Sequence, residues 1–82
     1  MEQFPRHDIE AILTNDLGLA AEVVKRGRLL TTGALESFDL VTLVSLIEVR
    51  FAVEIASSAI IPANFDSVDS MAALVANLRN RR

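Results

Sequence analysis

Apolar residues recur at helical spacing near the start of the chain and predict a helix over about residues 5–18. Spacings of three and four positions place them on one face of such a helix. Pro5 suits the first turn, where a backbone N–H has no partner, and Gly18 suits the left-handed position just past the end. The residues of this predicted buried face are Ile9, Ile12, Leu13 and Leu17.

A second helix is predicted over about residues 37–51, and both of its sides carry apolar residues. On the side opposite the core, Leu46 and Val49 are either covered, by another helix or by the preceding loop, or exposed to solvent. The sequence leaves both possibilities open. We expect Phe38 and Val41 to form an exposed partner-binding patch. The stripe that should pack on the core consists of Leu40, Leu43, Val44, Ile47 and Phe51.

The segment between these helices, residues 19–36, has no sustained periodicity and is predicted to be a long loop. It contains Gly27 and Gly33, and residues 20–24 are compatible with an extra helical turn. A loop of this length is unusual in a compact domain and is often functional. The apolar side chains that should pin it to the core are Val23, Leu29, Leu30 and Leu35.

The apolar segment 52–55 is too short to form a sheet with nothing to pair against. Residues 57–61 are predicted to form one short helix that ends before Pro62, because proline disfavours the helical conformation of the preceding residue. Phe65 should then fill the core from a loop.

The last predicted helix begins near Ser67, a good cap residue, with Asp69 in its first turn, where a negative charge is favourable. Its expected buried stripe consists of Val68, Met71, Ala72, Val75 and Leu78. The whole pattern predicts an all-α fold, a small bundle of three main helices and one short helix, with a long loop between the first two main helices.

Composition and charge narrow the class of protein. The 82 residues fit one domain, residues 1–82, and 51% of them are apolar with no Trp or Tyr, which favours helices packed on helices. The net charge of −3 would repel nucleic acid. The N-terminal sequence lacks the apolar region of a signal peptide, and no apolar run approaches the roughly 20 residues that span a bilayer. We expect a cytoplasmic monomer.

The residues give little support for catalysis, and we expect no enzymatic activity. There is no cysteine, so any thiol chemistry must come from outside the polypeptide. A triad of His7, Asp8 and Ser37 would need a preorganised pocket and an oxyanion hole. The carboxylates that lack the spacing of a metal-ligand series are Glu36, Asp39, Glu48 and Glu54.

Ser37 has two interpretations from its position alone. It can cap the predicted second helix by accepting a hydrogen bond from a backbone N–H. It can also be an attachment point, because a phosphate on its hydroxyl would lie near the unpaired N–H groups and the positive end of that helix.

Residues 33–44, Gly-Ala-Leu-Glu-Ser-Phe-Asp-Leu-Val-Thr-Leu-Val, resemble the phosphopantetheine attachment region of acyl and peptidyl carrier proteins. The resemblance continues through Ile47-Glu48, residues 51–55 and residues 62–68, and so covers most of the chain. It implies a stand-alone carrier with the family's helical bundle. In that family a phosphopantetheinyl transferase uses coenzyme A and magnesium to place 4'-phosphopantetheine on the serine that corresponds to Ser37.

The resemblance further implies a carrier that is not a catalyst. Acyl or aminoacyl groups would be held as thioesters on the arm, loaded by a ligase and passed to downstream synthase enzymes. Glu36 stands where the family usually has aspartate, and Val49 and Arg50 replace common acids, so we expect more apolar docking with weaker salt dependence. The residues expected to meet partners are Glu36, Phe38, Asp39, Val41 and Glu48. The alternative is a helical interaction module with this fold and no modification.

Overall fold

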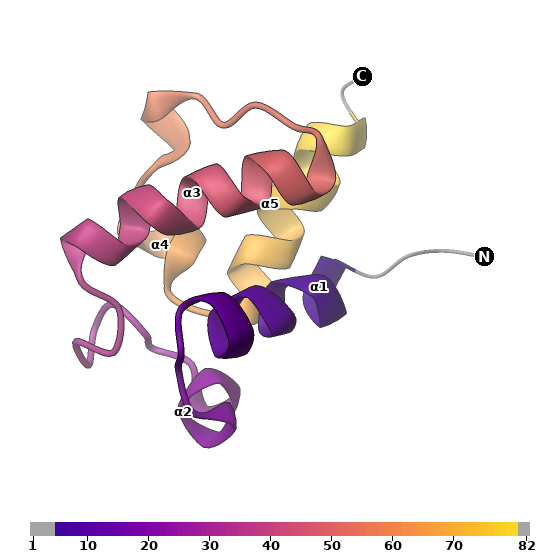
Figure 1. Ribbon diagram of the computed structural model, residues 1–82. Coiled ribbons are helices and arrows are strands. Elements are labelled where there is room, and N and C mark those ends of the chain that lie inside the picture. Colours follow the sequence, from indigo (N-terminus) through magenta and orange to yellow (C-terminus); the bar gives the residue numbers. More distant parts are fainter. Residues whose placement is uncertain (1–4, 81–82) are drawn as a thin grey trace.

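The structure is a computed structural model that describes residues 5–80, and within that range it contains helices and no strands (Figure 1). Three longer helices and several short ones confirm the predicted all-α class. The radius of gyration is 11.7 Å, as expected for a compact chain of this length. The elements in order are α1 (Pro5–Ala11), a π-helical turn (Ile12–Asp16), α2 (Ala21–Arg26), α3 (Ser37–Phe51), a 3-10 turn (Ser57–Ala59), α4 (Pro62–Phe65) and α5 (Val68–Asn80).

The first predicted helix is present, but it widens at its end. The N–H of Leu17 donates to the carbonyl of Ile12 at 3.1 Å, five residues back, as in a π-helix. Gly18 then takes a φ of +75°, the left-handed conformation expected there. The signal-peptide prediction concerns the N-terminal sequence, and residues 1–4 of that sequence lie outside the described residues. In the range 5–80 no helix is both long and apolar enough to cross a membrane.

The core is drawn from all five α-helices, the π-helical turn and the segments on either side of α3, because the apolar face of a helix is buried only against other parts of the chain. Helix α5 packs against α1 and α4, and α3 crosses over α5 (Figure 1). Leu40 and Val44, predicted core residues of α3, are only half-buried. The fully or almost fully buried side chains are Ile9, Ile12, Leu13, Val24, Leu29, Leu35, Leu43, Ile47, Phe51, Val53, Ile55, Phe65, Val68, Met71 and Val75.

The short helix predicted over residues 57–61 is present as the 3-10 turn Ser57–Ala59, which ends before Pro62, but Pro62 also begins a helix that was not predicted. Ile61 is extended, with φ −125° and ψ 153°, and Pro62 occupies the first turn of α4. Both facts follow from proline, which disfavours the helical conformation of the residue before it and has a φ suited to a first turn. Phe65 therefore fills the core from the last residue of α4 and not from a loop.

Ser67, which was predicted to cap the last helix, forms a reciprocal cap with Ser70 at the start of α5. The hydroxyl of Ser67 accepts the N–H of Ser70 at 3.1 Å, and the hydroxyl of Ser70 accepts the N–H of Ser67 at 3.2 Å. Asp69 in the first turn pairs with Arg6 of α1 at 2.7 Å. The N-terminal ends of α1 and α5 are thereby joined.

Two phenylalanines test the assignment of the buried and exposed faces. Phe65→Ala should lower the free energy of unfolding by about 3–5 kcal/mol, because the ring is completely buried. Phe38→Ala, the matched control, should change it by less than about 0.5 kcal/mol, because the ring is 81% exposed. Urea unfolding followed by circular dichroism measures both, and equal losses would show that the face of α3 is misassigned.

Candidate functional site

The segment between α2 and α3 is closed by two buried leucines. Leu29 and Leu35 are almost completely buried, and the N–H of Leu35 donates to the carbonyl of Leu29 at 2.9 Å. The turn between them contains Gly33, with a φ of +86°, which a residue with a side chain adopts only under strain. The chain is therefore turned back on itself directly before it enters α3.

Asp66, in the short link between α4 and α5, holds this segment in place. Its Oδ1 accepts the N–H of Leu30 at 2.7 Å and the N–H of Thr31 at 3.1 Å, and its Oδ2 accepts the Thr31 hydroxyl at 3.1 Å. Its backbone carbonyl accepts the N–H of Leu29 at 2.7 Å. Asp66 thus accepts hydrogen bonds from the backbone N–H groups of a loop some 36 positions earlier in the chain.

The same hydrogen bonds stabilise the charged form of the Asp66 carboxyl. The Thr31 N–H, followed by the Leu30 N–H, the Thr31 hydroxyl and the positive charge of Arg28, holds the pKa of Asp66 below its ordinary value. Partial burial acts in the opposite direction and does not outweigh them. The carboxylate is therefore ionised at neutral pH and is a strong acceptor for the loop.

Helix α3 is capped by Glu36 and not by Ser37. Glu36 is extended, with φ −109° and ψ 170°, and its carbonyl accepts the N–H of Leu40 at 3.0 Å. The Oδ2 of Asp39 accepts the N–H of Glu36 at 3.1 Å, as the third helical residue of a capping box does. Ser37 is the first helical residue and is exposed, and its hydroxyl bonds to no side chain or backbone group in the described part of the chain.

Apolar side chains surround the exposed serine. Phe38 is 81% exposed and Val41 is 68% exposed, and Glu36 is exposed beside them. Val49, further along α3, is 82% exposed, whereas Leu46 packs against the core. Of the two residues that the sequence left undecided, Leu46 is therefore covered and Val49 is exposed.

Two of the carboxylates expected to meet partners have bonds within the chain. Asp39 is half-buried and bonds to the N–H of Glu36, as described above. Glu48, about two and a half turns further along α3, is half-buried, and its Oε2 accepts the N–H of Ile55 at 2.8 Å. The structure gathers Glu36, Phe38 and Val41 around Ser37 and sets Glu48 apart.

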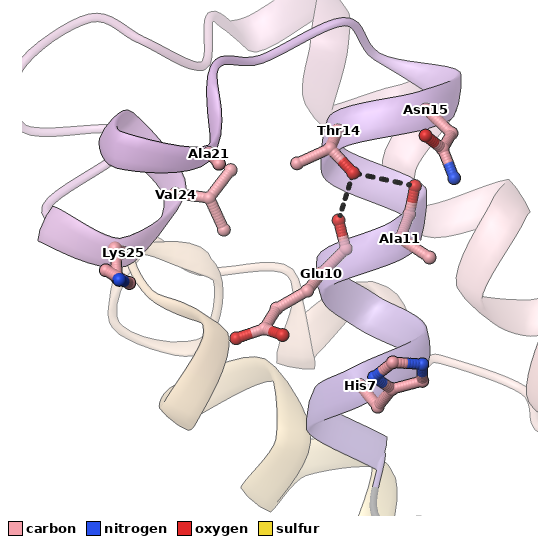
Figure 2. A pocket seen from close by; sticks show the side chains of 8 residues that line it. All are labelled: His7, Glu10, Ala11, Thr14, Asn15, Ala21, Val24 and Lys25. Carbon is pink, nitrogen blue, oxygen red and sulfur yellow. Dashed lines mark hydrogen bonds between the residues drawn. The ribbon is translucent and has the colours of Figure 1, made fainter.

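The residues considered for a catalytic triad do not come together. Asp8 lies 3.7 Å from Arg50, near the end of α3, and Ser37 is about 20 Å away along the helix axis. His7 instead lines a pocket of about 420 Å³ between α1 and α2, together with Glu10, Thr14 and Lys25 among others, and Ser37 is not part of it (Figure 2).

No group of three or more potential metal ligands is brought together within residues 5–80.

Comparison of the chain with known protein families, curated proteins and solved structures found no significant match. The site at the start of α3 is therefore interpreted from its own geometry and from the sequence motif.

The charge of Asp66 should make stability depend on pH. Because its pKa is lower in the folded protein, its stabilisation is complete above the unfolded-state value of about 3.9 and is lost as pH falls through the folded-state value. Asp66→Asn should therefore lower Tm at pH 7, and the difference from the unchanged protein should shrink below about pH 4.

Thermal unfolding between pH 7 and pH 3 measures this difference. Asp16→Asn makes the same change of charge at an exposed position and should leave Tm almost unchanged at pH 7. A loss in Asp66→Asn that is equally large at every pH would show that the charge of the carboxylate is not what holds the loop.

Proposed function

We propose that this protein is an acyl or aminoacyl carrier whose 4'-phosphopantetheine arm is attached to Ser37. The observation that carries the proposal is the exposed, unbonded hydroxyl of Ser37 at the first position of α3. Glu36 and Asp39 perform the capping that Ser37 would otherwise perform, so its hydroxyl is available for modification. The motif of residues 33–44, which resembles that of carrier proteins, supports the same role.

The start of α3 suits a phosphodiester on this hydroxyl. The first N–H groups of a helix have no carbonyl partner within it, and the helix dipole places positive potential there. During modification, Ser37 Oγ would form a bond to the phosphorus that carries pantetheine in coenzyme A. The pyrophosphate bond breaks, adenosine 3',5'-bisphosphate leaves with the electron pair, and the serine proton passes to a base of the transferase. Magnesium bound by the transferase would offset the charge of the pyrophosphate.

The arm would supply the thiol that a chain without cysteine lacks. Ser37 fixes one end of the arm to a helix, and the exposed Phe38 and Val41 lie where an enzyme acting on the arm must approach. The expected partners are a phosphopantetheinyl transferase, a loading ligase and downstream synthase enzymes. The protein itself would act as a cytoplasmic monomer and would not catalyse the reactions.

A second candidate function is a helical interaction module that keeps the fold without the modification. The exposure of Phe38 and Val41 favours it, because such a patch can bind a partner whether or not Ser37 is modified. This candidate predicts partner binding that Ser37→Ala leaves unchanged, and no modified form in cells.

Intact mass spectrometry tests the carrier proposal. Incubation with coenzyme A, magnesium and a broad-specificity phosphopantetheinyl transferase should add the mass of one phosphopantetheine group. Ser37→Ala should abolish the addition, and Ser58→Ala, which removes another exposed hydroxyl, should not. No mass increase, or an increase that persists in Ser37→Ala, would reject the proposal.

A further inference from the structure

The first turn of α3, which carries Ser37, has no fully buried residue of its own. Leu40 is half-buried, and the first completely buried side chain of the helix is that of Leu43, in the second turn. Helix ends without buried contacts fray, because opening them exposes little apolar surface. The position of Ser37 therefore depends on the segment that enters the helix.

That segment, the loop of residues 28–35, is anchored close to Ser37. Leu35 is buried and is separated from Ser37 by Glu36 alone, so at most about 7 Å of extended chain joins them. The N–H of Leu35 donates to the carbonyl of Leu29, which closes the loop. A change in the arrangement of this loop is therefore passed directly to the serine.

The hydrogen bonds that join this loop to another part of the fold converge on Asp66. Its carboxylate accepts two backbone N–H groups and the hydroxyl of Thr31, and its carbonyl accepts the N–H of Leu29. Hydrogen bonds are directional, whereas the burial of leucine side chains is not. The bonds to Asp66 therefore select one arrangement of the loop among those that burial alone allows.

We infer that Asp66 is a positioning residue for the modification of Ser37. The inference rests on the proposed function and gives the link between α4 and α5 a part in it. Asp66 acts through the loop, which presents Ser37 in the arrangement that a transferase binds. Without the carboxylate, the N–H groups of Leu30 and Thr31 would bond to water, and the loop would spend most of its time in other arrangements.

This role predicts which kinetic constant changes. An enzyme that binds only one arrangement meets a competent protein for a fraction of the time, and its apparent affinity falls by that fraction. Once the protein is bound, the hydroxyl is in place and the chemical step is unchanged. Loss of the carboxylate should therefore raise KM and leave kcat unchanged. A residue that served stability alone would change neither constant while the protein stays folded.

Steady-state kinetics with the broad-specificity phosphopantetheinyl transferase, coenzyme A and magnesium test this role. Asp66→Ala should raise the KM for the protein about tenfold and change kcat less than about twofold. Thr31→Val, which removes one bond to the carboxylate, should raise KM about threefold. Asp66→Asn keeps one acceptor oxygen for the two N–H groups, so its KM should lie between those of the unchanged protein and Asp66→Ala.

Two variants serve as controls. Thr32→Val removes a neighbouring exposed hydroxyl that bonds within the loop, to the carbonyl of Arg28 at 2.9 Å. Val75→Ala creates a cavity in the core about two turns into α5, and so lowers stability without removing a bond to the loop. Both should change KM less than about twofold at a temperature where circular dichroism shows every variant to be folded.

Hydrogen exchange followed by NMR adds a measurement that needs no transferase. In Asp66→Ala the N–H groups of Leu35 and Leu40, which bond within the loop and the first turn, should exchange about tenfold faster. Unchanged exchange, an unchanged KM for Asp66→Ala, a fall in kcat at constant KM, or an equal rise in KM for Val75→Ala would each overturn the inference alone. Absence of modification in the unchanged protein would reject the proposed function and this inference with it.

Discussion

The arrangement of this small fold depends on one carboxylate that joins two distant parts of the chain. Asp66 bonds to the backbone and side chain of the segment before α3. Leu29 and Leu35 bury that segment, but burial alone does not fix the position of a backbone with unpaired N–H groups. The carboxylate supplies those partners, so the entry into α3 takes one defined path.

The sequence predicted the three longer helices because their periodicity is local and their ends carry proline, glycine and serine signals. It did not predict the role of Asp66, because a bond between residues 36 positions apart leaves no mark in a local pattern. The helix that begins at Pro62 was missed for a different reason. Proline can follow one helix or begin another, and here the buried Phe65 favours a helical turn after it.

The candidate site shows the same division between local and distant information. The exposure of Phe38 and Val41 followed from helical geometry, since both lie opposite the core stripe. The helix is capped one position before Ser37. The extended backbone of Glu36 and the hydrogen bond from its N–H to the carboxylate of Asp39 decide where the helix begins. Whether Val49 was covered depended on tertiary packing, which periodicity does not reveal.

The capped start of α3 also has a mechanical consequence. A group attached to Ser37 would be tethered to a rigid helical turn, whereas the attachment point of a similar group on a loop would itself move. With a fixed attachment point, the length and flexibility of the attached group alone would set the volume that its free end can reach. The local concentration of the cargo at a docked active site would then depend on the orientation of α3 against the partner.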